Sequence, residues 1–163
     1  MNTFQKYYLS IGSNIGDRFK NIQTALDIIH TKIASFISIS AVYETKAVGF
    51  KGDNFFNICA SFNSRIEPEN LMNELLQIEI SMGRIRKNTN TYESRIIDID
   101  ILIAGDLVIE NQTLSLPHPR MTDRLFVMLP LVEIEPNLLH PILNLSCREI
   151  LNKIKKNDGV QKT

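Results

Sequence analysis

The sequence lacks an excess of charge of either sign, because 18 lysine and arginine residues balance 18 aspartate and glutamate residues. Proteins that bind nucleic acid or an anionic membrane surface usually carry a broad field of positive charge. Neither class of partner is expected for this chain. Any site for a phosphate group must therefore be built from a local cluster of basic side chains.

The sequence is also poor in cysteine and in long apolar runs. Its two cysteines, Cys59 and Cys147, do not have the spacing of a metal site, and the apolar run around Cys59 favours a buried free thiol. No apolar segment is long enough to cross a bilayer, and the first residues lack the apolar segment of a signal peptide. These absences predict a protein of a reducing compartment, the cytoplasm.

No phosphate-binding loop of the G-x-x-x-x-G-K-S/T type occurs in the chain. ATP, if it binds, must be held in another way. The sequence also has no internal repeat, low-complexity tract or linker, and 163 residues suit one domain. We therefore expect a single domain over residues 1–163, with a frayed tail after about residue 157.

Hydrophobic periodicity predicts the elements of an α+β fold. Apolar alternation or continuous apolar runs predict strands over 7–11, 37–43, 55–62 and 95–103. Apolar residues at helical spacing predict helices over 17–36, 68–83, 122–133 and 146–155. Asp17 is the expected N-cap of the first helix. The order over the first hundred residues matches the split βαβ arrangement. We expect a ferredoxin-like α+β sandwich, with a mostly antiparallel sheet and helices packed on it.

The most informative stretch is 95–103, in which two aspartates stand among branched aliphatic residues. Side chains alternate between the faces of a strand, so Asp98 and Asp100 share one face and the isoleucines at 97, 99, 101 and 103 share the other. Carboxylates at this spacing lie roughly 7 Å apart and repel each other by roughly 2–3 kcal/mol. Mg²⁺ is the natural cation to place between them, because it is usually shared by one or two carboxylates and substrate phosphates. A solvated strand face is the alternative explanation.

Basic residues lie close to this strand in the sequence. Arg84, Arg86 and Lys87 follow the second predicted helix, and Arg95 precedes Asp98 by three residues. The polar, aperiodic segment 84–95 is expected to be exposed and able to move. Guanidinium groups grip phosphate oxygens, and arginines beside a metal stabilise the charge that moves in phosphoryl transfer. The set favours a polyphosphate ligand, although residues 84–87 alone are also explained by the dipole of the preceding helix.

Three further side chains have both a structural and a functional explanation. His118 lies between two prolines, which fixes the direction of an imidazole for hydrogen bonding, for proton transfer or for a purely structural contact. Asn57 interrupts an apolar strand, where either a heterocyclic ligand or an internal hydrogen bond would satisfy its amide. Phe126 either stacks on a planar ligand or packs in the core.

Together, these residues resemble the 6-hydroxymethyl-7,8-dihydropterin pyrophosphokinase family, whose members pass the terminal diphosphate of ATP to a pterin alcohol. The resemblance runs over nearly the whole chain. It is carried by Ile11-Gly12-Ser13-Asn14, Tyr43-Glu44-Thr45, Asn57, Gly83-Arg84-Ile85-Arg86-Lys87, Arg95-Ile96-Ile97-Asp98-Ile99-Asp100-Ile101-Leu102, Leu116-Pro117-His118-Pro119, Arg124-Leu125-Phe126-Val127-Met128-Leu129-Pro130-Leu131 and Glu133-Ile134.

The resemblance implies a role for each of these positions. Asp98 and Asp100 would bind two Mg²⁺ ions that bridge the phosphates of ATP, the co-substrate. The catalytic residues that it implies are Arg84, Arg86, Arg95, Asp98 and Asp100. The ATP-binding residues that it implies are Arg84, Arg86, Arg95, His118 and Arg124. The pterin-binding residues that it implies are Thr45, Val48, Phe55, Asn57 and Phe126, with two aromatic rings enclosing the pterin. The expected products are AMP and the pterin diphosphate of folate biosynthesis, made by a monomer without an obligate protein partner.

The chain departs from the family pattern in its loops. Many members have Trp-Gly-Pro-Arg where this chain has Tyr92-Glu93-Ser94-Arg95, and Lys46-Ala47 replaces a proline pair.

The sequence also argues against two rival functions. Nucleotidyltransferases have a Gly-Ser pair shortly before their paired aspartates, whereas Gly12-Ser13 lies most of a domain away from Asp98. A ferredoxin-like RNA-binding module would need exposed aromatic residues on its central strands, where this chain has aspartates.

Overall fold

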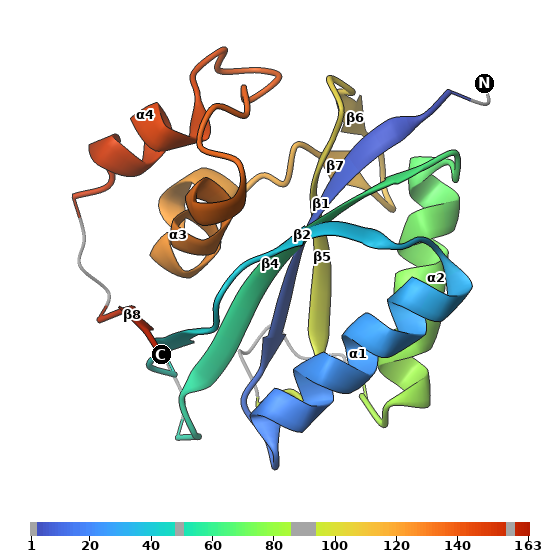
Figure 1. Ribbon diagram of the computed structural model, residues 1–163, viewed down its shortest axis with the longest axis vertical. Coiled ribbons are helices and arrows are strands. Elements are labelled where there is room, and N and C mark those ends of the chain that lie inside the picture. Colours follow the sequence, from blue (N-terminus) through green and yellow to red (C-terminus); the bar gives the residue numbers. More distant parts are fainter. Residues whose placement is uncertain (1–2, 48–50, 86–93, 156–158) are drawn as a thin grey trace.

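The computed structural model describes residues 3–47, 51–85, 94–155 and 159–163. Its main sheet lies between two pairs of helices, α1 with α2 on one face and α3 with α4 on the other (Figure 1). The strands of the described residues are β1 (Gln5–Ser13), β2 (Phe36–Ile39), β3 (Tyr43–Thr45), β4 (Phe55–Ser64), β5 (Asp98–Ala104), β6 (Ile109–Glu110), β7 (Ser115–Leu116) and β8 (Gln161–Lys162). The helices are α1 (Arg18–Lys32), α2 (Pro68–Ser81), α3 (Leu125–Ile134) and α4 (Cys147–Lys153), with a short 3₁₀ helix at Met121–Asp123.

The main sheet has the strand order β5-β1-β4-β3-β8, and β2 pairs with β4 beside β3. Its strand pairs are all antiparallel. Helix α1 connects β1 to β2, and α2 connects β4 to β5, as in two interleaved βαβ units. The prediction of a ferredoxin-like α+β sandwich is therefore confirmed. Strands β6 and β7 form a separate hairpin after β5.

Two apolar cores lie on opposite faces of the sheet. Ile97, Ile99 and Ile101 face the core under α1 and α2, as the alternation predicts. Ile103 belongs instead to the core under α3 and α4, so its predicted placement is wrong. The register between β1 and β5 shifts at Tyr8 and Leu9, and such a bulge reverses the alternation beyond it. The aspartates precede the bulge and keep the predicted face.

The first helix begins as predicted and ends earlier. The side chain of Asp17 accepts a hydrogen bond from the backbone N–H of Lys20 at 3.0 Å, which caps α1. The helix ends at Lys32 because Phe36 is already paired with Phe62 in β2. The single strand predicted over 37–43 is wrong, because residues 40–42 separate β2 from β3.

Later elements are shorter than their predicted ranges. Helix α3 begins at Leu125, because the residues before it form the 3₁₀ turn rather than an α-helix. Helix α4 ends at Lys153 and is capped by Ser146, whose hydroxyl and backbone exchange hydrogen bonds with Glu149. Strand β5 begins at Asp98 rather than at residue 95.

The end of the described chain lies along the sheet, where the sequence suggested a frayed tail. Strand β8 pairs with β3, and the backbone N–H of Thr163 donates to Val42 O at 2.9 Å. Cys59 and Cys147 are both free and buried, as expected for Cys59 from its apolar surroundings. No helix among the described ranges is long and apolar enough to cross a membrane.

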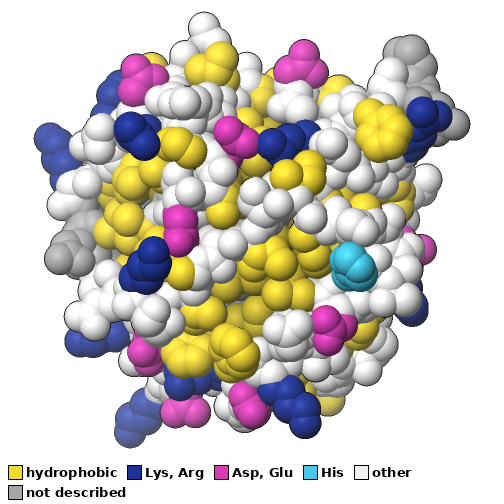
Figure 2. All heavy atoms as spheres, viewed as in Figure 1, with side chains coloured by type: hydrophobic (Ala, Val, Ile, Leu, Met, Phe, Trp, Pro, Cys, Tyr) yellow, Lys and Arg dark blue, Asp and Glu magenta, His cyan; other side chains and the backbone are white. Residues whose placement is uncertain are grey.

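Charges of both signs are dispersed over the face of the molecule drawn in Figure 2. Figure 2 shows lysine and arginine side chains interspersed with aspartate and glutamate around an apolar centre, on the side where Figure 1 draws β2. Ile37 and Ile39 of β2 are about half exposed, with 51% and 48% of their surface open to solvent. This dispersion agrees with the balanced charge of the sequence.

Candidate active site

The register of the strands places a predicted pterin-binding residue, Asn57, and a predicted metal-binding residue, Asp98, on one row across the sheet. Gly12 of β1 pairs with Asn57 of β4 on one side and with Asp98 of β5 on the other. Directly paired residues point to the same face, so Asn57 and Asp98 lie two strand spacings apart, roughly 10 Å. That face is the one covered by α3, because Cys59, two residues along from Asn57, contacts the carbonyl oxygen of Val127. A ligand that is hydrogen-bonded to Asn57 would therefore lie beside a second ligand bound at Asp98.

Asn57 has an unsatisfied amide. Its side chain is buried, and its Nδ2 is the buried side-chain polar atom that lacks a hydrogen-bond partner among the described residues. A buried donor without a partner costs about 1–3 kcal/mol. Gly12 permits the close approach, because a Cβ at this position would lie 2.6 Å from Asn57 Oδ1. The unsatisfied donor favours the predicted role of Asn57 in reading a ligand over an internal hydrogen bond.

Asp98 is held between two of the predicted arginines. Its Oδ1 lies 2.8 Å from Arg84 Nη1, and its Oδ2 lies 3.0 Å from Arg95 Nη1. Arg84 also lies 2.6 Å from the carboxylate of Glu79, which is buried in α2 and accepts a hydrogen bond from the backbone N–H of Ile99 at 2.8 Å. The ion pairs therefore run from helix α2 through Arg84 to the aspartate strand. They fix a guanidinium beside each oxygen of Asp98.

Asp100 is the less compensated of the two aspartates. Burial raises the pKa of Asp100, and the negative charges of Asp98 and Glu79 raise it further, while Arg124 and Arg95 oppose the shift. The two carboxylates fit the oxygen donors that Mg²⁺ prefers, and a cation there would favour the charged form of Asp100. Among the described residues, no group of three or more His, Cys, Asp and Glu side chains is arranged so that it could hold a metal ion. Mg²⁺ needs no such cluster, because it is commonly held by one or two carboxylates and substrate phosphates.

Asn14 explains how Arg95 is held beside Asp98. The backbone N–H of Asn14 donates to Arg95 O at 3.0 Å, and Asn14 Oδ1 accepts from Arg95 N. The Asn14 amide also donates to Ser94 Oγ and to Asp53 O, both at 3.2 Å. One side chain at the end of β1 therefore joins the residues before β5 to those before β4.

His118 and Arg124 lie near the aspartates. The backbone N–H of His118 donates to Leu102 O of β5 at 2.8 Å, and its Nδ1 accepts from the backbone N–H of Arg120 at 3.2 Å. Burial lowers the pKa of His118, and Arg124 lowers it further, while Asp98 acts in the opposite direction. Burial and Arg124 both favour the neutral imidazole, and because Nδ1 accepts a hydrogen bond, the neutral form carries its proton on Nε2.

Phe126 lies in α3, and the predicted pterin-binding residues of the strands lie on the face of the sheet that α3 covers. The guanidinium carbon of Arg124 lies 5.5 Å from the centre of the Phe126 ring, in the first turn of α3. Thr45 pairs with Phe55 two residues beyond the pair of Tyr43 and Asn57, so both point to the face that carries Asn57. The structure thus brings Thr45, Phe55 and Asn57 to one face of the sheet.

Two predicted site residues, Val48 and Arg86, lie outside the described residues. The sequence reasoning missed two others, Asn14 as an anchor and Glu79. A signal existed for Glu79, because it lies four residues after Leu75 on the apolar face of α2. A carboxylate on the buried face of a helix needs a charged partner, and that partner is Arg84.

The sequence model of the 7,8-dihydro-6-hydroxymethylpterin-pyrophosphokinase family matches residues 8–136. The chain belongs to this family. The matched range contains every predicted site residue, from Thr45 to Phe126. The resemblance inferred from the motifs is confirmed.

Named relatives in this family differ greatly in length. The 2-amino-4-hydroxy-6-hydroxymethyldihydropteridine pyrophosphokinase of Aquifex aeolicus is 39% identical over 87% of this chain and 88% of its own length. The enzyme of the same name from Porphyromonas gingivalis is 37% identical over 82% of this chain and 92% of its own. The folic acid synthesis protein fol1 of Schizosaccharomyces pombe is 39% identical over 90% of this chain, which spans only 20% of that protein.

Solved structures share the fold at low sequence identity. The wild-type HPPK-DHPS of Plasmodium falciparum with pteroate superposes with a TM-score of 0.75 and 17% identity, over 94% of this chain and 43% of that one. The same protein with pterin and p-hydroxybenzoate gives a TM-score of 0.74 at 18% identity, over 93% of this chain and 42% of that one. At this identity, the likeness establishes the fold alone.

Proposed function

We propose that this protein transfers diphosphate from ATP to the hydroxymethyl group of 6-hydroxymethyl-7,8-dihydropterin and releases AMP, as a step of folate biosynthesis. The observation that carries the proposal is the row Asn57, Gly12 and Asp98. It sets an unsatisfied, buried amide roughly 10 Å from a carboxylate that is flanked by arginines. The family membership and the bacterial relatives of similar length support the same activity.

The pterin half of the site selects the acceptor by shape and hydrogen bonding. Asn57 Nδ2 donates to an acceptor on the edge of the pterin ring, which satisfies the buried amide. Phe126 covers one face of the ring, and Thr45 and Phe55 bound its other end. These contacts point the hydroxymethyl group along the row toward Asp98, where its oxygen attacks the β-phosphorus of ATP. Such alignment removes much of the entropic cost of bringing two substrates together.

The nucleotide half of the site stabilises the charge of the transferred diphosphate. Arg84 and Arg95 are already held beside Asp98, so they reach phosphate oxygens without large rearrangement. His118 and Arg124 complete the set of hydrogen-bond donors, and Arg86 adds a further positive charge. Mg²⁺ bound by Asp98 and Asp100 would act as a Lewis acid on the phosphates of ATP.

Separation of the nucleotide products tests the proposal. The protein is incubated with ATP, Mg²⁺ and the pterin alcohol, and the products are resolved by anion-exchange chromatography and weighed by mass spectrometry. We expect one AMP for each pterin diphosphate, and neither product when the pterin is omitted. Formation of ADP and a pterin monophosphate would replace diphosphate transfer with ordinary phosphoryl transfer.

A further inference from the structure

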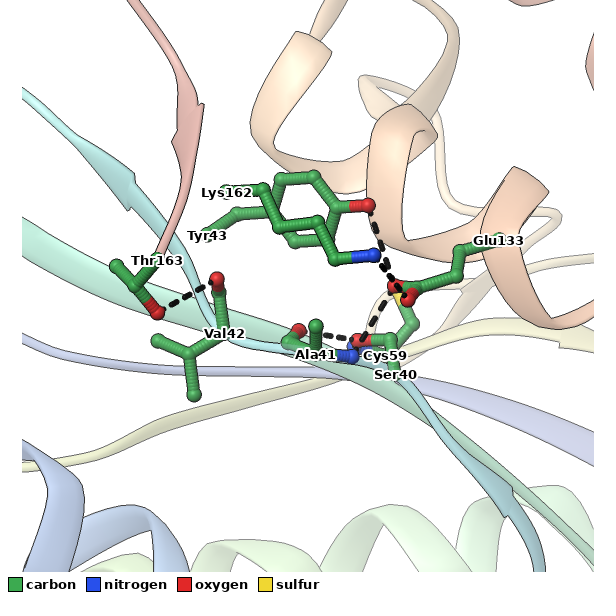
Figure 3. Close-up of polar contacts among 8 residues, drawn as sticks. All are labelled: Ser40, Ala41, Val42, Tyr43, Cys59, Glu133, Lys162 and Thr163. Carbon is green, nitrogen blue, oxygen red and sulfur yellow. Dashed lines mark hydrogen bonds and ion pairs between the residues drawn. The ribbon is translucent and has the colours of Figure 1, made fainter.

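Glu133 takes no part in the chemistry proposed above, yet its carboxylate accepts three hydrogen bonds in the last turn of α3 (Figure 3). Its Oε2 accepts from the backbone N–H of Ala41 and from the hydroxyl of Tyr43, both at 3.1 Å. Its Oε1 accepts from Lys162 Nζ at 3.0 Å. The three donors belong to the link between β2 and β3, to β3 and to β8. One carboxylate thus joins α3 to three segments at the edge of the sheet.

The same helix carries Phe126, which is the proposed wall of the pterin slot. Phe126 and Glu133 are seven residues apart, so they lie on the same face of α3, separated by about 10 Å along the axis. Helix α3 is attached to β4 near its first turn, where Cys59 Sγ lies 3.5 Å from Val127 O. Glu133 supplies a second attachment near its last turn. Two attachments, one near each end, fix the angle of the helix over the sheet.

Glu133 also contacts β3, the strand that ends at Thr45 of the proposed pterin pocket. Residues 40–42 form a break between β2 and β3. At its start, Ser40 is bound to β4, because its N–H donates to Cys59 O and its hydroxyl accepts from Cys59 N, both at 2.9 Å. The next residue, Ala41, donates its backbone N–H to the carboxylate of Glu133 instead of to β4. Strand β3 then has only three residues, and it ends at Thr45. The carboxylate therefore determines where β3 begins and the direction in which it carries Thr45.

The register links this contact directly to Asn57. Tyr43, whose hydroxyl donates to Glu133, is the residue paired with Asn57 across β3 and β4. Burial raises the pKa of Tyr43 to about 12, and the charge of Glu133 raises it as well, so the hydroxyl stays protonated and remains a donor. Partial burial acts to raise the pKa of Glu133, but the hydrogen bonds from Lys162, Ala41 and Tyr43 lower it overall. At neutral pH, Glu133 is therefore a charged acceptor, and the hydroxyl of Tyr43 remains a donor to it.

We propose that Glu133 is a positioning residue for the pterin half of the site, one that sets the width of the slot between Phe126 on α3 and Thr45 and Asn57 on the sheet. The inference rests on the proposed function, because the slot is defined by its pterin substrate. It assigns Glu133 no role at the nucleotide half, since its carboxylate contacts residues 41, 43 and 162. Loss of the carboxylate should therefore weaken pterin binding and leave ATP binding unchanged.

Three substitutions separate positioning from general stability. Glu133→Ala removes all three hydrogen bonds. Glu133→Gln keeps an oxygen that accepts from Ala41 and Tyr43, while it gives up the charge that pairs with Lys162. Glu135→Ala is the matched control, because Glu135 follows α3 by one residue, has a similarly exposed side chain and forms an ion pair with Lys6 at 2.8 Å.

Pterin affinity is measured by the intrinsic fluorescence of the ligand, which no tryptophan emission overlaps because the chain contains no tryptophan. Steady-state kinetics with each substrate varied in turn, and thermal unfolding, complete the set. We expect Glu133→Ala to raise the Kd and KM for pterin at least tenfold, with the KM for ATP changed less than twofold. Glu133→Gln should recover most of the pterin affinity. Glu135→Ala should lose comparable thermal stability with no change in pterin affinity.

Equal losses for pterin and ATP in Glu133→Ala, or the same pterin loss in Glu135→Ala, would overturn the positioning role. If Glu133→Ala does not fold, Tyr43→Phe tests the same contact and should raise the pterin KM selectively by a smaller factor. Wild-type protein that forms AMP and pterin diphosphate while Glu133→Ala retains full pterin affinity would refute this inference and leave the proposed function standing. Wild-type protein that binds no pterin would refute both.

Discussion

The two halves of the site differ in how their polar groups are satisfied by the fold. On the β5 side, the carboxylates of Asp98 and Glu79 are compensated by Arg84 and Arg95 in a chain of ion pairs. On the β4 side, Asn57 is uncharged and its Nδ2 has no hydrogen-bond partner among the described residues. The charged half therefore contributes to folding as well as to the proposed catalysis, whereas the unsatisfied Nδ2 of Asn57 costs stability until a ligand binds. Substitutions in the ion-pair chain of the charged half should lower the free energy of unfolding, whereas substitution of Asn57 should lower pterin affinity with little change in stability.

The largest effect should come from the aspartates. We expect Asp98→Ala and Asp100→Ala each to lower kcat by at least roughly 10²-fold, the scale on which loss of one group that stabilises transition-state charge is felt. Asp100→Ala should not lower the free energy of unfolding, because it removes repulsion with Asp98 and Glu79. Steady-state kinetics and urea unfolding measure the two quantities. Asp106→Ala, in the turn after β5, is the matched control and should retain full activity.

A large effect on stability should come from Glu79. Glu79→Ala leaves Arg84 with one carboxylate partner and removes the acceptor for the N–H of Ile99. Breaking a buried ion pair from one side costs about 3–5 kcal/mol in the free energy of unfolding. Chemical denaturation measures this loss, and kcat should fall with it. The exposed ion pair of Lys6 and Glu135 provides the comparison, since Lys6→Ala should cost no more than about 1 kcal/mol. Similar losses of unfolding free energy in Glu79→Ala and Lys6→Ala would contradict the claim that the buried ion pairs of the charged half stabilise the fold.

The opposite pattern should follow from a change in the neutral half. Asn57→Leu replaces an unsatisfied amide by an apolar group of similar shape, so the free energy of unfolding should change by less than about 1 kcal/mol. Pterin affinity should fall by about 1–3 kcal/mol, roughly ten- to a hundredfold in Kd. Fluorescence titration with the pterin measures the affinity. Asn63→Leu, at an exposed position of the same strand, should leave the affinity unchanged. An unaltered pterin Kd in Asn57→Leu would return Asn57 to a structural role.

Local patterns in the sequence predicted the parts of this site that depend on one element. Alternation along residues 95–103 placed Asp98 and Asp100 on one face, and helical spacing placed Arg84 just after α2. The bulge that turns Ile103 to the other core was not predictable, because it depends on the register between β1 and β5. The strand order alone would also not have placed Asn57 and Asp98 on either side of Gly12, which requires the same register.

Contacts between distant segments account for the other surprises. Asn14 and Glu133 contact partners from distant segments, as Glu79 does with the backbone N–H of Ile99, and their local sequences do not specify those partners. The break between β2 and β3 and the pairing of β8 with β3 have the same origin. Short strands of this kind depend on neighbouring elements rather than on their own propensity. The resemblance to the family supplied the residue roles but not these supports.

The central claim is that the two substrates meet across Gly12, with the metal end of the row roughly 10 Å from Asn57. Paramagnetic broadening tests it directly, with Mn²⁺ in place of Mg²⁺, a non-hydrolysable ATP analogue and ¹⁵N-labelled protein. The side-chain amide of Asn63, six residues further along β4 and about 20 Å away, is the internal reference. We predict that the amide signals of Asn57 are broadened strongly while those of Asn63 stay sharp. Equal broadening of the two, or none at Asn57, would contradict the arrangement.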